Sequence, residues 1–355
     1  MKSLFNTTSK LLVATSLVLS IGTSSLMAEV KDKFTVSWTI YVGFMPWDYA
    51  QQTGIVDKWA KKYDIEIDLV QVNDYIESIN QYTLGKFDAC LMTNMDALTI
   101  PAAGGVDSTA LIMGDFSNGN DGIILKNTNK LSDIKGQNVN LVELSVSHYL
   151  LARGLESVGL SERDVRVVNT SDADMVAAYS SNEVTALVPW NPQLSEIMKS
   201  KSANLVFDSS KIPGEIIDML VVNTTTLKDN PKLAKALTGA WFEVMELMKK
   251  GDEKALTFMA EGSGTDLEGY KSQLKSTKMF YDAKEAVEFA DSESLPAVMK
   301  KVSEFSYDHG ILGEGAPNAE FIGMEFPGGK TFGDKKNIKL RFTDTYIKLA
   351  ADGKL

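Results

Sequence analysis

The stretch Phe34-Thr-Val-Ser-Trp-Thr-Ile-Tyr41, followed by Val42-Gly-Phe-Met-Pro-Trp-Asp-Tyr49, indicates the fold class. The first segment is rich in β-branched and aromatic residues and predicts a strand, and the second predicts a loop. A helical pattern around Trp59 comes next, and Ile65-Glu-Ile-Asp-Leu-Val70 predicts a second strand. Another helical pattern leads to a third strand within Gly85-Lys-Phe-Asp-Ala-Cys-Leu-Met-Thr-Asn94. This βαβαβ order predicts an α/β fold.

Polar and aromatic residues follow two of these strands. In open α/β sheets, ligands bind outside the carboxyl ends of the strands. The segments Met45-Pro-Trp-Asp48 and Thr93-Asn-Met-Asp96 lie at such ends. We therefore expect ligand contacts from Trp47, Asp48, Tyr49, Asn94 and Asp96.

The first 28 residues have the pattern of a secretory signal peptide. Lys2 and Lys10 charge the start, and residues 11–21 form an apolar run that is too short to span a bilayer. Ala28 offers a small residue at the predicted cut, and no cysteine follows it that could carry a lipid. We expect a periplasmic protein that does not span the membrane.

The composition is acidic, with 47 Asp and Glu against 36 Lys and Arg and a net charge of −11. This balance argues against binding to nucleic acid or to an anionic membrane surface. A length of 355 residues predicts about two domains. The single cysteine, Cys90, lies in an apolar segment and is expected to be a small buried residue.

Strand and helix patterns alternate to about residue 225, and the remainder is mainly helical. Turn-rich or apolar segments near 114–124 and 216–224 predict two crossings between two lobes. The expected limits are 29–115 with 222–355 for lobe I, and 116–221 for lobe II.

Three further residues are candidate ligand contacts. Glu143 ends a strand just before Ser145-Val-Ser147, and Trp190 ends another between Pro189 and Asn191. Asp218 interrupts an apolar strand, where a charge needs a partner. Each candidate also has a structural alternative: the acids could cap helices, lie on the surface or pair with Lys, and the aromatic residues could pack in the core.

Catalytic and metal-binding patterns are missing from the sequence. His148 and His309 are the only histidines, and no metal-ligand cluster accompanies them. Gly329-Lys-Thr331 lacks the spacing of a phosphate loop, and no Gly-x-Ser-x-Gly pattern occurs. We expect no catalytic residue, no metal and no cofactor, and hence a binding protein rather than an enzyme.

Five segments, in this order and spacing, resemble the substrate-binding proteins of nitrate/taurine-type ABC importers. The likeness covers about residues 34–250 and implies a two-lobed periplasmic binding protein fold (type II), a two-strand hinge and a permease partner. The segments are Gly85-Lys-Phe-Asp-Ala89, Leu131-Ser-Asp-Ile-Lys-Gly136, Ala152-Arg-Gly-Leu155, Asp172-Ala-Asp-Met-Val-Ala177 and Ala186-Leu-Val-Pro-Trp-Asn-Pro192.

Two segments resemble a narrower subgroup, whose transporters are associated with urea carboxylase. They are Trp38-Thr-Ile-Tyr-Val-Gly-Phe-Met-Pro-Trp47 and Val188-Pro-Trp-Asn-Pro192. This resemblance implies guanidine or urea as the solute.

The chemistry of the strand-end loops favours a cation. Anion binders generally use Arg, Lys or a helix N-terminus, whereas the four arginines of this chain all lie outside the predicted strand-end loops. A guanidinium ion needs carboxylates around its edge and an aromatic face above it.

We therefore predict a monomeric receptor that captures guanidinium for nitrogen uptake by closure of its lobes. The alternatives are a receptor for urea, a pyrimidine or a taurine-like solute, and an enzyme acting on a vitamin precursor.

Overall fold

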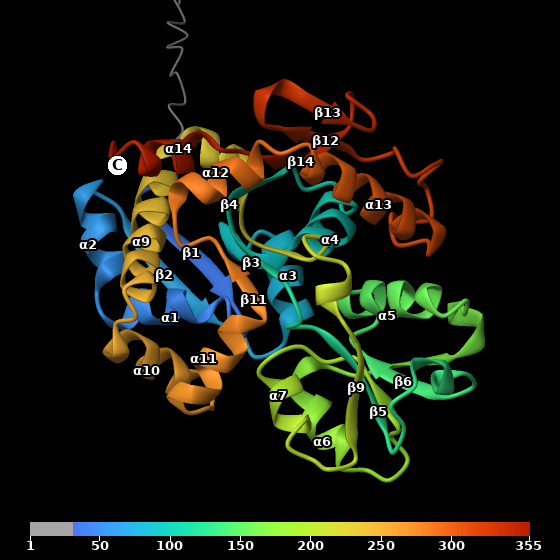
Figure 1. The fold of residues 1–355 in the computed structure, drawn as a ribbon. Coiled ribbons are helices and arrows are strands. Elements are labelled where there is room, and N and C mark those ends of the chain that lie inside the picture. Colours follow the sequence, from blue (N-terminus) through green and yellow to red (C-terminus); the bar gives the residue numbers. More distant parts are fainter. Residues whose placement is uncertain (1–30) are drawn as a thin grey trace, which may run out of the picture. The chain divides into compact units, whose positions relative to one another are not determined.

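The structure is a computed structural model that describes residues 31–355 (Figure 1). The predicted signal peptide, residues 1–28, lies outside the described residues. Within residues 31–355, no helix is both long and apolar enough to cross a membrane.

The larger of two sheets has nine strands, in the order β13-β12-β14-β4-β10-β3-β1-β2, with β11 paired to β4. Strand β1 is parallel to β2 and β3, as a βαβαβ unit requires, so the three predicted strands are confirmed. Strand β10 is antiparallel to both β3 and β4. The bounds are β1 Lys33–Trp38, β2 Glu66–Gln71, β3 Ala89–Thr93, β4 Ser108–Ser117, β10 Ile217–Asn223, β11 Thr277–Met279, β12 Gly323–Phe326, β13 Lys330–Phe332 and β14 Ile338–Phe342.

The smaller sheet has five strands in the order β7-β6-β8-β5-β9. Strand β6 is parallel to β7 and β8, and β5 is antiparallel to β8 and β9. The bounds are β5 Gly122–Lys126, β6 Asn138–Leu141, β7 Arg166–Asn169, β8 Ala186–Leu187 and β9 Ala203–Asp208.

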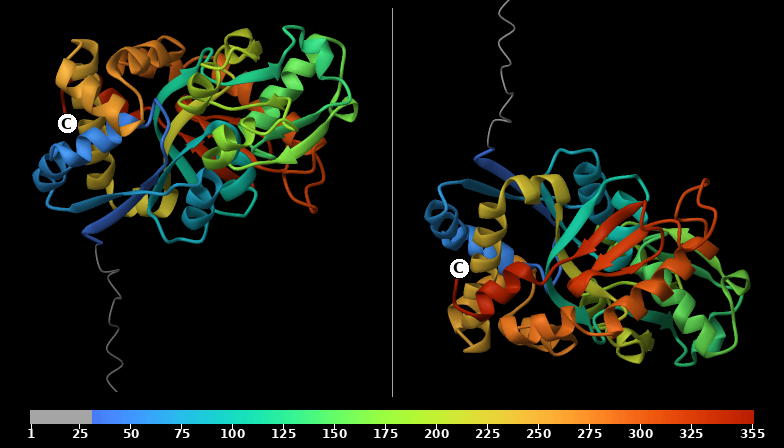
Figure 2. Two further views of the ribbon diagram at one scale, coloured as in Figure 1. Left: turned by 90° about the horizontal axis from the view of Figure 1, so that it is seen from below. Right: turned by 90° about the horizontal axis from the view of Figure 1, so that it is seen from above.

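The chain passes between the sheets twice. It leaves β4 for β5 through residues 118–121, and it returns from β9 to β10 through residues 209–216. These two crossings give the two-lobed fold (Figure 2). Strand β10 pairs within the larger sheet along its whole length, so the second crossing precedes the range 216–224. The lobe limits given above remain a prediction.

Helices cover the larger sheet, and local sequence explains where several of them begin. Asp74 caps α3 by accepting a hydrogen bond from the N–H of Glu77, and Thr93 caps α4 through the N–H of Asp96. The predicted loop 42–49 is wrong in its second half, because α1 begins at Met45 with Pro46 in its first turn. The bounds are α1 Met45–Gln52, α2 Ile55–Lys62, α3 Tyr75–Thr83 and α4 Asn94–Ala97.

The region after β10 is mainly helical, as predicted, but four short strands within it join the larger sheet. Figure 1 shows α9 and α12 covering this sheet and α13 beside its β12–β14 end. The bounds are α8 Thr224–Asp229, α9 Pro231–Lys249, α10 Glu253–Gly262, α11 Leu267–Lys275, α12 Ala283–Ala290, α13 Ser294–Asp308 and α14 Thr345–Ala351.

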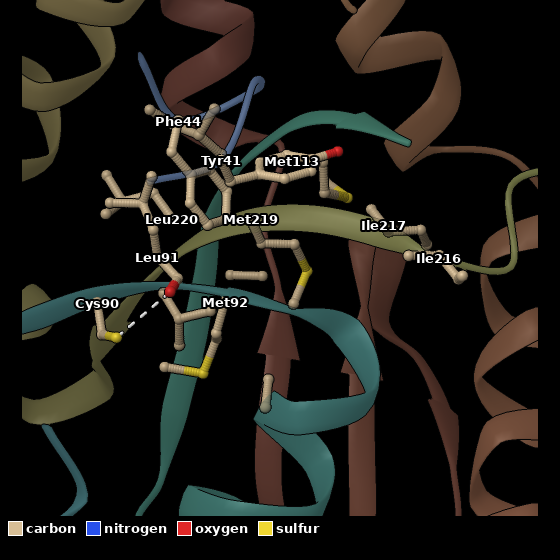
Figure 3. Packing of buried hydrophobic residues seen from close by; sticks show 14 of the residues in the cluster. Tyr41, Phe44, Cys90, Leu91, Met92, Met113, Ile216, Ile217, Met219 and Leu220 are labelled. Carbon is tan, nitrogen blue, oxygen red and sulfur yellow. Dashed lines mark hydrogen bonds between the residues drawn. The ribbon is translucent and has the colours of Figure 1, made fainter. Parts of the chain in front are cut away.

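Around the smaller sheet lie α5 Val146–Ser157, α6 Met175–Tyr179 and α7 Gln193–Ile197. The main hydrophobic core follows β3 and β10 of the larger sheet (Figure 3). Cys90 is fully buried there, as expected, and lies opposite Val221 of β10.

Candidate ligand-binding site

A small, partly open cavity of about 20 Å³ lies between the two sheets. The larger sheet contributes Tyr41 and Phe44 from the segment after β1, Thr93 from the end of β3 and Asp218 from β10. Asp218 is paired with Thr93 in the sheet, so all of these residues meet at one edge. The cavity therefore lies at the carboxyl ends of β1 and β3, where an α/β sheet binds ligands.

The other wall comes from the smaller sheet and the first crossing. Asp121 lies in the crossing and forms an antiparallel bridge with Trp190, which follows β8. Val146, the first residue of α5, completes this wall. Both sides of the two-lobed fold thus contribute to the cavity, which at about 20 Å³ has room for little more than one water molecule.

Asp115 and Asp218 face each other on neighbouring strands. Both are buried, and Tyr41 Oη lies 2.9 Å from an oxygen of Asp218 and 3.3 Å from one of Asp115. Burial raises the pKa of Asp115 to about 7. Burial, and next the charge of Asp115, raise the pKa of Asp218 well above its ordinary value. The pair therefore retains a proton near neutral pH, because two adjacent carboxylates cannot both ionise cheaply.

Asp121 is a third buried carboxyl at the cavity. It accepts a hydrogen bond of 2.5 Å from Ser117 Oγ. Burial raises its pKa to about 7, and the charge of Asp96 adds to the effect.

Asp96 lies behind the wall and is held by residues that line the cavity. Its Oδ2 accepts hydrogen bonds from Tyr75 Oη at 2.7 Å and from Thr93 Oγ1 at 2.8 Å. Burial raises the pKa of Asp96 to about 6. Its second oxygen is buried and has no hydrogen-bond partner among residues 31–355.

Cations are missing from this region. The residues that line the cavity include no Lys, Arg or His. Within residues 31–355, none of the four aspartates forms an ion pair, although all are at least 95% buried. Aromatic rings supply much of the wall: Trp190 and Tyr75 pack edge to face at 5.6 Å, and Tyr41 and Phe44 at 4.8 Å. A cavity lined by carboxyl groups and aromatic rings, without a basic side chain, suits a small cation better than an anion.

Of the residues predicted from sequence, the structure places Asp218 and Trp190 in the cavity wall and Asp96 directly behind it. Asn94 is buried but occupied, because its side chain donates to the carbonyl of Glu215 and accepts from the N–H of Ile217. Asn94 therefore anchors the start of β10 and has no free group for a ligand.

The other predicted contacts lie outside the cavity. Trp47 is buried against Trp241, with the rings stacked 5.2 Å apart, because helix α1 turns this side chain towards α9. Asp48 and Tyr49, on the same helix, are half-buried, and Tyr49 packs edge to face on Phe258. Glu143 is exposed to solvent. The structure thus corrects the candidate set for these four residues.

Sequence reasoning missed Asp115 and Asp121 as candidates. The segment 114–122 looks like a turn, but β4 continues through it to Ser117 and buries Asp115. A usable pattern was present: Asp115 follows an apolar run, just as Asp218 interrupts one. Asp121 carries no such pattern, and only the bridge to Trp190 brings it to the cavity.

A wider opening of about 460 Å³ lies next to the cavity. Its walls contain Ile40 and Asn73 from the larger-sheet side and Asp172 and Gln193 from the smaller-sheet side. Asp172 accepts a hydrogen bond of 3.4 Å from the N–H of Tyr75, which lines the cavity.

The model of the family described as NMT1/THI5 like matches residues 44–255. A relative from Brucella abortus, provisionally named a binding protein, is 22% identical over 186 residues, which are 51% of this chain and 57% of the relative. The taurine-binding periplasmic protein of Escherichia coli is 22% identical over 117 residues, covering 32% of this chain and 36% of that protein. The match thus spans little more than half of the first relative and about a third of the second.

Among solved structures, the alkanesulfonate-binding protein SsuA from Xanthomonas axonopodis pv. citri, bound to MOPS, has a TM-score of 0.67. The two chains are 16% identical, and the match covers 81% of this chain and 96% of that one. This likeness establishes the α/β periplasmic binding protein fold.

Proposed function

We propose that this chain, which belongs to the NMT1/THI5-like family, is the periplasmic substrate-binding protein of an ABC importer and captures guanidinium. The shared fold, with two crossings between two lobes, supports a receptor that closes around a solute. The role also requires a signal peptide and a permease partner, as the sequence predicts, and we expect a monomer.

One observation carries the choice of solute. Two buried aspartates, Asp121 and Asp218, line the cavity, and its lining contains no basic side chain. Two more, Asp96 and Asp115, accept hydrogen bonds from lining tyrosines. The relatives named above are described as binding taurine or an alkanesulfonate, which are anions at the sulfonate group. An anion placed here would meet buried carboxyls without a cation to balance it. A cation would satisfy the same carboxyls, so the cavity opposes the solute class of these relatives.

Guanidinium fits the arrangement in shape as well as charge. The ion is planar and presents only donors, which match the acceptor oxygens of Asp121 and Asp218. Its flat face can pack on an aromatic ring such as Trp190. The cavity is small, about 20 Å³, so it favours a small ion over a large dye or peptide, and the lobes must open to admit the ion.

Urea is a second candidate, and the raised pKa of Asp218 favours it. A protonated Asp218 can donate a hydrogen bond to the urea carbonyl, while ionised Asp121 accepts from its amide groups. Urea then binds best when Asp218 is protonated, whereas guanidinium binds best when the carboxyls are ionised. The pH dependence of binding separates the two solutes.

Calorimetric titration at pH 7.5 with guanidinium chloride, urea, taurine and nitrate tests the proposal. We expect saturable binding of guanidinium and none of taurine or nitrate, with sodium chloride titrated as the ionic-strength control. Tight binding of taurine without binding of guanidinium would refute the assignment. Recovery of unchanged guanidinium after incubation would distinguish a receptor from an enzyme.

A further inference from the structure

His148 and His309, the two histidines among residues 31–355, both contact the carboxylate of Glu162. Glu162 contacts His148 through one oxygen and His309 through the other. His148 lies on α5, which packs on the smaller sheet, and His309 ends α13, which packs beside the larger sheet. The three residues, here called the latch, therefore join the two lobes.

The hydrogen bonds of His148 fix it as a neutral ring. Its Nδ1 accepts a hydrogen bond from the N–H of Leu144 at 3.1 Å, so this nitrogen carries no proton. Its single proton is then on Nε2 and is donated to Glu162. With both nitrogens used in this way, His148 has no lone pair for a metal ion, which argues against a metal site here.

The partners of His309 require the charged ring instead. Its Nδ1 lies 2.8 Å from the carbonyl oxygen of Phe305, and its Nε2 contacts Glu162. Both partners are acceptors, so both nitrogens must donate, and only the imidazolium ion can do this. The hydrogen bond to Glu162 raises the pKa of His309. The two histidines hold Glu162 as a carboxylate, and its pKa is lowered to about 2.

We propose that Glu162, His148 and His309 form a proton-dependent latch between the lobes, closed when His309 is charged and released when it loses its proton. A neutral His309 has one proton for two acceptors and must give up either Phe305 or Glu162. Because the pKa of His309 is raised by the latch, the closing effect is complete below the ordinary histidine value of about 6.5. It is lost as the pH rises through the raised pKa.

The charges around the latch do not reproduce this behaviour. Glu215 binds Arg153 on α5 at 3.0 Å and Lys301 on α13 at 2.9 Å, so it also bridges the lobes. Its pKa is lowered, and that of Arg153 is raised, so this pairing stays charged at neutral pH. The remaining charged groups on the groove walls between α5 and α13 are Glu156, Glu304 and Asp308.

The cavity aspartates and Asp172 are competing sources of pH dependence, because burial raises their pKa values to about 6 to 7. Asp172 also joins the lobes, since it accepts a hydrogen bond from the N–H of Tyr75. Variants of the latch leave these aspartates in place, so they separate the two effects. The inference holds whatever the solute is, since no latch residue lines the cavity.

The test measures the distance between spin labels at Lys232→Cys on α9 and Glu183→Cys beside β8, both exposed positions, from pH 5.5 to 8.5. Cys90 is buried and stays unlabelled. We expect the ratio of latched to released molecules to fall as the pH rises through the raised pKa of His309. Glu162→Gln should abolish this dependence, and His309→Lys should keep the latched distance at every pH.

Lys301→Gln is the matched control, because it weakens the neighbouring bridge without touching the latch. It should lower the latched fraction equally at all pH values and retain the pH dependence. The proposal is overturned if the spin-label distance in the labelled protein without further changes does not depend on pH. It is also overturned if the labelled Glu162→Gln variant shows the same pH dependence. Circular dichroism at each pH establishes that every variant is folded.

Discussion

The cavity between the sheets and the groove between α5 and α13 both hold carboxylates at the boundary of the lobes, but in opposite electrostatic states. In the cavity, burial raises the pKa values of Asp96, Asp115 and Asp121 to about 6 to 7. In the groove, cationic or hydrogen-bond partners lower the pKa values of Glu162 and Glu215. The groove contains the partners of its carboxylates, and the cavity does not.

This difference distinguishes carboxylates that hold the fold together from carboxylates that are available to bind a ligand. A buried carboxylate with a built-in cation stabilises the fold and has nothing left to offer a ligand. A buried carboxyl without one opposes folding when it ionises, and such a cost is typical of functional sites. The predictions below test whether the cavity and the groove really differ in this way.

The largest expected effect comes from removing the cavity charges. The double variant Asp121→Asn with Asp218→Asn should weaken guanidinium binding by about 100-fold or more, since each lost charge-assisted hydrogen bond contributes roughly 1.5–3 kcal/mol. Calorimetry at pH 7.5 measures the change. Glu143→Gln makes the same chemical change at an exposed position and should bind like the unaltered protein. Equal affinities for all three proteins would exclude the cavity as the site.

The stability of the ligand-free protein should fall as pH rises, because of the cavity carboxyls. Their folded-state pKa values are raised, so their destabilising effect is absent below the unfolded value near 4 and complete above about 7. We expect a loss on the order of 2–4 kcal/mol between pH 5 and pH 8. Thermal melts measure it.

The double Asn variant provides the comparison for this pH effect. It should melt higher than the unaltered protein at pH 8 and show a flatter pH profile. The raised pKa of His309 contributes in the same direction, so a residual slope is expected to remain. If the melting temperature of the double variant depends on pH as steeply as that of the unaltered protein, ionisation of the cavity aspartates does not destabilise the fold.

Loss of the aromatic wall should have a smaller effect on binding. Trp190→Ala should reduce guanidinium affinity by about 1–2 kcal/mol if the ring packs on the ion. Trp47→Phe is the matched aromatic control, because Trp47 packs on Trp241 in the core. It should lower the melting temperature and leave the dissociation constant unchanged. If Trp47→Phe weakened binding and Trp190→Ala did not, Trp47 rather than Trp190 would contact the ligand.

The smallest effect is expected in the groove. Lys301→Gln removes one partner of Glu215, but the lysine side chain is 55% exposed. An exposed ion pair contributes about 1 kcal/mol or less, and Arg153 still neutralises Glu215. The melting temperature should therefore fall only slightly and by the same amount at pH 6 and pH 8. A large drop would show that the groove, too, is poorly neutralised.

Part of the candidate site could be predicted because some polar residues stand within or directly after apolar segments, where a charged side chain is unexpected. Asp218 interrupts an apolar strand, so its position has no local explanation and requires a tertiary one. Asp96 follows a buried strand and lies beside Thr93, as predicted, although it supports the wall from behind. Trp47 and Asp48 failed because Pro46 starts a helix where a loop was expected, and a helix sends neighbouring side chains in different directions.

The sequence by itself determined the α/β order, the strands β1 to β3, the burial of Cys90 and the scarcity of arginine near the strand ends. These follow from short-range patterns that fix which face of each segment is buried. Only the tertiary structure decided that Asp121 and Asp218 share one cavity, with Asp115 beside Asp218, and that His148 and His309 share Glu162. Such meetings depend on strand order, on the two crossings and on helix packing between lobes, and no local pattern encodes which distant segments come together.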